Sequence, residues 1–88
     1  MLGLFGKRPT IHKVEAESVA QLLADMTKDM SNTDFVNSAD RLVREACFRV
    51  GIAEELKDKE YREICQLAIR LKSGDRSRAT VDSTLKSF

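Results

Sequence analysis

The chain has 88 residues, of which 42% are hydrophobic and 33% are charged, and its formal net charge is +1. That length fits one domain with a single core, and the apolar content is too high for a disordered chain. The near-zero charge argues against a general polyanion binder but leaves room for a local basic patch.

The first nine residues, MLGLFGKRP, combine a short apolar tip with two positive charges and the only proline. In one interpretation, Leu2, Leu4 and Phe5 insert into a membrane surface while Lys7 and Arg8 meet acidic head groups. In the other, the flexible tip folds back onto the rest of the chain, which the marginal membrane affinity of three apolar side chains favours. The tip is too short for a secretory signal, and no apolar run approaches the ~20 residues of a membrane span, so we expect a cytoplasmic protein.

Residues 10–30 have the pattern of a first helix, with Thr10 as its N-cap and one apolar face. That face comprises Val19, Leu22, Leu23, Met26 and Met30. The segment Ser31–Asp34 interrupts the pattern and resembles a capping box, which predicts the start of a second helix. A connection this short makes the two helices antiparallel neighbours.

Residues 33–51 carry the clearest helical pattern in the chain. The apolar stripe comprises Phe35, Val36, Ala39, Leu42, Val43, Ala46, Cys47 and Val50. Gly51 follows the stripe, where a left-handed C′ position favours glycine. Because Ala39 and Ala46 are small, the line that they form with the stripe's valines predicts the closest helix–helix crossing, either within the chain or with a second copy.

Residues 53–57 predict a short helical turn, and Asp58 is the expected N-cap of a third helix over 59–73, which Gly74 ends. Its apolar face consists of Ile64, Leu67, Ala68 and Leu71, flanked by Tyr61, Cys65 and Ile69. A helix that is apolar over so much of its circumference is either central to a bundle or shared with a partner. Glu60 and Glu63 are interpreted as a solvated flank of this helix.

Residues 73–78, SGDRSR, form a hinge of turn residues. Beyond it, Val81, Leu85 and Phe88 are spaced as i, i+4 and i+7, which predicts a short fourth helix. Its serines and threonines make it weak, so it docks on its own bundle, swaps onto a second subunit, or stays frayed until a partner binds. The sequence therefore predicts an all-α bundle of three main helices plus a short C-terminal helix, divided into a tip (1–9), a bundle domain (10–74) and a docking tail (75–88).

The residues that catalysis and metal binding need are sparse. His12 is the only histidine, and Cys47 and Cys65 lie far apart on predicted core faces without a CxxC pattern. No nucleophile is placed beside a base, and no cluster has zinc-ligand spacing. We therefore expect a non-enzymatic protein with no cofactor and no metal, whose cysteines stay reduced.

The pattern favours protein interaction: a helical adaptor, inhibitor or regulatory subunit that acts through exposed apolar helix faces and forms a homodimer. The support is the broad apolar face of the third helix, the alanine-lined edge of the second, and the apolar patches at both ends. The candidate interface residues are Ala39, Val43, Ala46, Val50, Ile64, Leu67, Leu71, Val81, Leu85 and Phe88.

A nucleic-acid-binding regulator is the alternative, because basic residues of the second helix and the C-terminal region could contact phosphates. These candidates are Arg41, Arg44, Arg49, Arg76 and Arg78. Against it, the helix after Gly51 is too apolar to serve as the recognition helix of a helix-turn-helix. A peripheral membrane protein tethered by the apolar tip is the weaker alternative.

Overall fold

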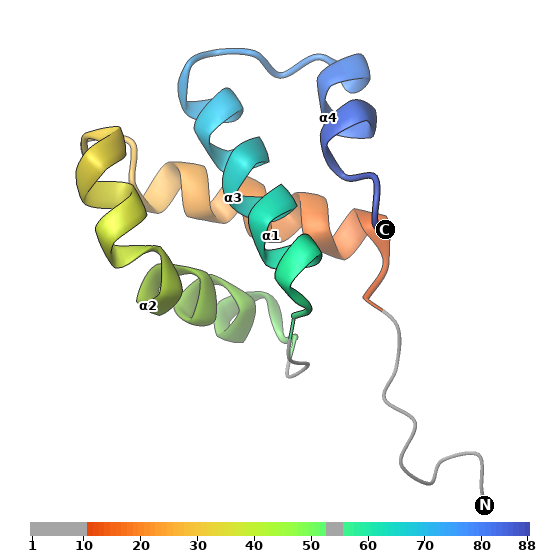
Figure 1. Cartoon of the computed structure of the whole chain (residues 1–88), viewed down its shortest axis with the longest axis horizontal. Helices are drawn as coiled ribbons and strands as arrows, with labels where there is room; N and C mark the ends of the chain where they lie inside the picture. Colours follow the sequence, from red (N-terminus) through yellow and green to blue (C-terminus); the bar gives the residue numbers. More distant parts are fainter. Residues whose placement is uncertain (1–10, 53–55) are drawn as a thin grey trace, which may run out of the picture.

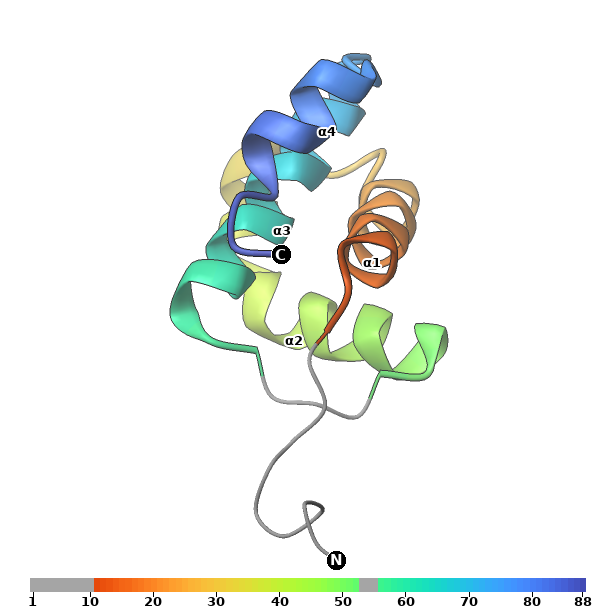
Figure 2. The same cartoon turned by 90° about the vertical axis from the view of Figure 1, so that its right-hand side faces the viewer.

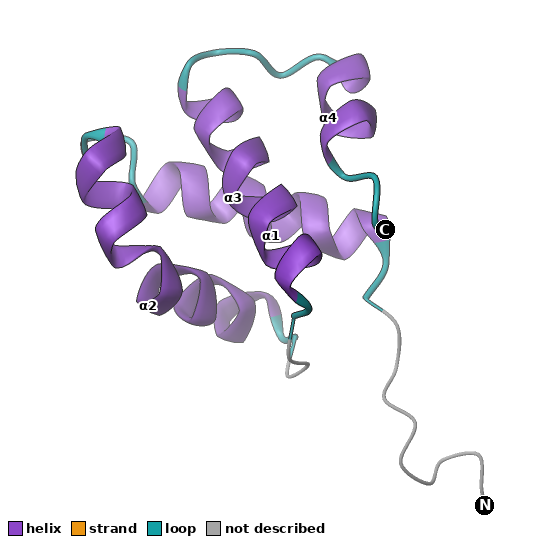
Figure 3. Ribbon diagram, viewed as in Figure 1, coloured by secondary structure: helices purple, strands orange, loops and turns teal. Residues whose placement is uncertain are grey.

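The computed structural model describes residues 11–52 and 56–88, and this part of the chain contains four helices and no strand. The helices are α1 (Lys13–Met26), α2 (Asn32–Val50), α3 (Asp58–Lys72) and α4 (Arg78–Thr84). Figures 1 and 3 show the short α4 beside α3. The predicted all-α fold with three main helices and a short C-terminal one is confirmed. The tip 1–9, Thr10 and residues 53–55 of the predicted turn lie outside the described residues.

The helix α3 is the centre of the bundle. It contacts α1, α2 and α4, and its most extensive contact is with α1. Figures 1 and 2 show α2 running back past α1 at an oblique angle, while α4 runs antiparallel to α3. The broad apolar face of α3 is therefore explained by its position between three other helices of the same chain.

The core is built from large apolar side chains of all four helices. Those that are almost completely buried are Val19, Leu23, Phe35, Ile64, Leu67 and Leu85. Burying each such side chain contributes about 1.5–3 kcal/mol to folding. Lys72, at the end of α3, closes one edge of the core: its ammonium lies 5.1 Å from the centroid of the Phe35 ring and donates a hydrogen bond of 3.0 Å to the Met30 carbonyl.

The helix contact predicted from the alanines of α2 is not the most extensive one. Ala39 and Ala46 are buried, but the most extensive helix contact is between α1 and α3. The face of α1 turned toward the core carries Ala16, Ala20 and Ala24, each at most 2% exposed. These alanines are spaced four residues apart, so they form a ridge of small side chains, which is the kind of ridge that lets two helices approach closely. The predicted apolar face of α1 consisted of leucines, methionines and a valine, and the structure adds these buried alanines to it.

Three predicted helix ends are confirmed. The Ser31 hydroxyl oxygen accepts a hydrogen bond of 3.1 Å from the Asp34 backbone N–H, which caps α2. Gly51 has φ 91°, and the backbone N–H of Ile52 donates to the Cys47 carbonyl at 2.8 Å, the bond that defines a Schellman ending. Gly74, with φ 99°, ends the segment after α3 in the same way.

Two helix starts and one end differ from the prediction. α1 begins at Lys13, where the His12 backbone N–H donates to a carboxylate oxygen of Glu15 at 2.9 Å. It ends at Met26 and not at Met30; at the C-cap, the buried hydroxyl of Thr27 donates a hydrogen bond of 2.8 Å to the Leu23 carbonyl, and the chain then turns. α3 begins one residue early, at Asp58, so Asp58 lies in the first turn and is not the cap.

The start of α3 also corrects the interpretation of Glu60 as a solvated residue. Glu60 is 7% exposed, and its carboxylate accepts a hydrogen bond of 2.8 Å from the Lys57 backbone N–H. A glutamate at the third helical position can reach back to the cap residue in this way. The acid is therefore part of the helix start.

The short helix α4 docks on its own bundle. Val81 and Leu85 are 3% and 1% exposed, and Phe88 packs against the core with partial exposure. A helix of seven residues is not stable alone in water, so docking and helix formation go together. The spacing of Val81, Leu85 and Phe88 that predicted α4 thus also identified the side chains that attach α4 to the bundle.

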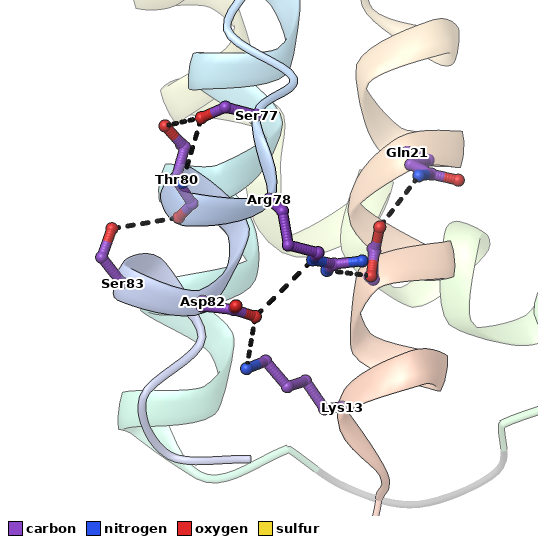
Figure 4. A network of polar contacts seen from close by, with 8 residues as sticks. Lys13, Gln21, Ser77, Arg78, Thr80, Asp82 and Ser83 are labelled. Atoms are coloured by element: carbon purple, nitrogen blue, oxygen red, sulfur yellow. Dashed lines mark hydrogen bonds and ion pairs between the residues drawn. The ribbon is translucent and has the colours of Figure 1, made fainter.

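Polar contacts join α4 to α1 across the surface (Figure 4). The Lys13 ammonium lies 2.7 Å from a carboxylate oxygen of Asp82, and the Arg78 guanidinium lies 2.6 Å from Glu17. Gln21 donates a hydrogen bond of 3.3 Å to the same Glu17. These groups are all partly exposed to solvent, so their contribution depends on pH and salt.

Candidate interaction surfaces

Most of the predicted interface residues are already buried within the chain. Of the ten candidates, Val50 and Phe88 are half-buried, and the other eight are at most 6% exposed: Ala39, Val43, Ala46, Ile64, Leu67, Leu71, Val81 and Leu85. Their burial is explained by contacts between α1, α2, α3 and α4. A surface for a partner must therefore be sought among other side chains of the folded chain.

Three large apolar side chains are exposed in the described residues: Val14 (74%), Val36 (63%) and Phe48 (82%). Phe48 stands out because it is aromatic and lies directly opposite the buried stripe of α2. The residues Asn37, Arg41, Arg44 and Phe48 are spaced as i, i+4, i+7 and i+11, so they share one face of the helix. We call these four residues the α2 outer face; all are exposed.

The five arginines predicted to contact nucleic acid do not form one cluster. Three of them pair with acids: Arg49 with Glu45 at 2.5 Å, Arg44 with Asp40 at 3.4 Å, and Arg78 with Glu17 and Asp82. Arg41 and Arg76 make no ion pair with any described residue. Figure 1 places the α3–α4 loop, which carries Arg76, and the second half of α2 on opposite sides of the molecule.

A polar groove that was not predicted from the sequence lies between α3 and the segment that ends α4. Its volume is about 510 Å³, and four cations line it: Lys59, Arg62, Arg70 and Lys86. The acid in its lining, Glu63, accepts hydrogen bonds from the backbone N–H of Ser87 at 2.8 Å and from the Ser87 hydroxyl at 2.6 Å. We call this feature the α3–α4 groove. The signal in the sequence was the spacing of Lys59, Glu63 and Arg70 on one flank of α3, but which element covers that flank depends on the docking of α4.

The thiols are poor nucleophiles in this fold. Burial raises the pKa of Cys65 to about 11, although a hydrogen bond with Tyr61 partly offsets this, and burial also raises the pKa of Cys47. A thiol with a raised pKa is protonated at neutral pH and reacts slowly. His12 is exposed at the start of α1. Among the described residues, no group of three or more His, Cys, Asp or Glu side chains is placed to hold a metal ion.

Comparison of the chain with protein-family models, with curated proteins and with solved structures finds no match. In the described part of the chain, none of the helices has both the length and the apolar content required to cross a bilayer. Leu2, Leu4 and Phe5, the predicted membrane contacts, lie outside the described residues.

Proposed function

We propose that this protein is a protein-interaction module that binds an acidic segment of a partner through the α2 outer face. The observation that supports it is Phe48, an aromatic side chain 82% exposed on the side of α2 opposite the core. Aromatic and arginine residues are enriched among the side chains that dominate binding energy at protein interfaces. The α2 outer face has both kinds within two helical turns.

The charges of this face favour a partner with carboxylates. Arg41 makes no ion pair with any described residue, and Arg44 is held only loosely, with 3.4 Å between its guanidinium and Asp40. Both side chains can therefore turn toward a partner without breaking a strong internal contact. In this arrangement Phe48 fills an apolar pocket of the partner, while the two guanidinium groups fix the orientation through charge-assisted hydrogen bonds.

The homodimer stays a prediction. The α2 outer face is poorly suited to be the interface between its two copies. In a two-fold dimer each residue meets its counterpart or a neighbour of it. Two such faces would bring the arginines of both copies together, which is unfavourable. Gel filtration with light scattering measures the oligomeric state; a dimer that Phe48→Ser dissolves would contradict this assignment of the face.

The partner surface is tested by affinity purification from the native host with three versions of the full chain. Phe48→Ser should lose the partner recovered with the unchanged chain, because it removes the aromatic anchor. Val36→Ser is the matched control, since Val36 is also exposed on α2 but lies outside the proposed face. With the purified partner, Arg41→Glu should raise Kd by about tenfold or more. Equal recovery by Phe48→Ser and the unchanged chain would overturn the proposal.

Nucleic-acid binding is less well supported than protein binding, because acids of the same chain engage some of the candidate arginines. Arg49 and Arg78 are engaged by acids, so fewer cations are free than the sequence suggests. Titration of a labelled DNA duplex at low and at physiological salt tests it, since phosphate contacts are strongest at low salt. Binding that Arg41→Glu abolishes would favour nucleic acid over an acidic protein on the α2 outer face.

A further inference from the structure

The α3–α4 groove carries four cations against one acid in its lining. None of Lys59, Arg62, Arg70 and Lys86 forms an ion pair with a described residue, in contrast to the paired cations Lys13 and Arg78 on the α1 side of α4. The carboxylate of Glu63 is occupied by two hydrogen bonds from Ser87. The groove therefore offers a net positive, polar lining to a ligand.

The geometry of the groove suits an elongated anion. Lys59, Glu63, Gln66 and Arg70 are spaced as i, i+4, i+7 and i+11, so they form a ridge roughly 16 Å long at 1.5 Å per residue. The opposite wall supplies Ser83, Thr84, Lys86 and Ser87. A ligand in the groove thus meets cations at both ends of the ridge and Lys86 on the opposite wall, where the hydroxyls of Ser83 and Ser87 already donate to Thr80 and Glu63.

Thr84 provides an independent observation at the same place. It is 6% exposed, lines the groove, and its hydroxyl oxygen is buried without a hydrogen-bond partner. Buried hydroxyl groups in folded proteins almost always have a partner. Because this oxygen is buried, a ligand in the groove would bond to it only after the Thr84 side chain turned toward the groove.

We propose that the α3–α4 groove binds a small ligand that carries more than one phosphate group. The volume of about 510 Å³ falls in the range of small-molecule sites. No aromatic side chain is among the described residues that line the groove, so it has no platform on which a nucleic-acid base would stack. This site lies on different helices from the α2 outer face, so ligand binding there would be a second activity. Its test is independent of the test of the interaction proposed above.

Isothermal titration with inorganic tripolyphosphate tests the site in the full chain, together with amide chemical shifts. We expect binding at low and at physiological salt, with shifts concentrated in residues 59–70 and 83–87. Arg62→Gln and Arg70→Gln should each raise Kd by about tenfold, because each removes a charge-assisted contact. Arg49→Gln is the matched control: it removes the same charge from an exposed position outside the groove and should leave Kd within about twofold.

Three results would overturn the proposal. One is the absence of heat at low salt, where attraction between the groove and an anion is strongest. Another is an equal loss of affinity in Arg49→Gln, which would mean attraction by net charge alone. The third is binding of a short single-stranded oligonucleotide, weakened by Arg62→Gln, without binding of tripolyphosphate; that result would make the groove a nucleic-acid surface. Circular dichroism of each variant checks that the helices are retained.

Discussion

The contact between α1 and α3 and the attachment of α4 are built in different ways. α1 meets α3 through a ridge of alanines and fully buried side chains such as Val19 and Leu23. α4 and the residues after it contribute the buried Val81 and Leu85 and the half-buried Phe88, together with surface ion pairs to α1 and hydrogen bonds from Ser87 to Glu63. The first contact depends on close packing, which pH and salt hardly change. The second is smaller and partly electrostatic, so we expect α4 to open more easily than the rest of the bundle.

The largest expected effect is on the α1–α3 side. Leu23→Ala should lower the free energy of unfolding by about 2–5 kcal/mol, because Leu23 is completely buried and its truncation leaves a cavity. Chemical denaturation followed by circular dichroism measures this. Ala79→Gly, at an exposed position of α4, serves as a surface comparison. A loss below that of the surface variant would show that the α1–α3 contact is not the stable part of the molecule.

Leu85→Ala makes the same truncation on the α4 side and sharpens the comparison. Leu85 is 1% exposed, but the loss is limited to the free energy with which α4 docks, so we expect about 2 kcal/mol or less in global unfolding. Hydrogen exchange should show loss of protection in residues 78–84 while α1 amides stay protected. If α1 and α4 lose protection together, the bundle opens as one unit, and the proposed difference in stability between the α1–α3 contact and α4 is wrong.

The smallest effect is the pH dependence of α4. The hydrogen bond and charge of Lys13 lower the pKa of Asp82, and hydrogen bonds from Thr80 and Ser77 lower the pKa of Asp75. A carboxylate with a lowered folded pKa stabilises the fold above its unfolded pKa, near 4, and this contribution is lost as pH falls through the folded value. Residues 78–84 should therefore lose amide protection on acidification before α1 does.

The matched variant for this pH effect is Asp82→Asn, which cannot titrate. Its α4 protection should already be lower at neutral pH and should change less between neutral and acidic pH than that of the unchanged chain. If the pH profile of α4 amide protection is unaltered in Asp82→Asn, the effect comes from Asp75 or from the core, and the Lys13–Asp82 pair does not cause it.

The helices were predictable from the sequence because their signals are local. The stripe of α2, the Ser31 cap and the glycines at 51 and 74 each act within a few residues, and all are confirmed. The N-cap of α1 is His12, two residues after the predicted Thr10, and the signal is again local: the His12 backbone N–H donates to the Glu15 carboxylate in the first turn. Local rules therefore fixed the elements to within a few residues.

The surfaces were not predictable, because they depend on which faces meet. Ile64 and Leu71 have the same spacing whether a partner or α1 covers them, and in the structure contacts within the chain bury both. Phe48 had no place in the predicted interface, since a single aromatic on a polar face gives no periodic signal. The α3–α4 groove likewise exists only once α4 has docked beside α3. Which helix faces contact each other depends on residues far apart in the chain, and a single sequence does not reveal these contacts.

The thiol of Cys47 gives the molecule its own reporter of opening. Cys47 is buried within α2 and burial raises its pKa, whereas Cys65 in α3 is only half-buried. A thiol-specific reagent must therefore wait for α2 to move away from its neighbours before it reacts with Cys47 at an appreciable rate. The labelling rate of Cys47, compared with that of the more accessible Cys65, measures how often α2 leaves the bundle, with no probe introduced into the chain.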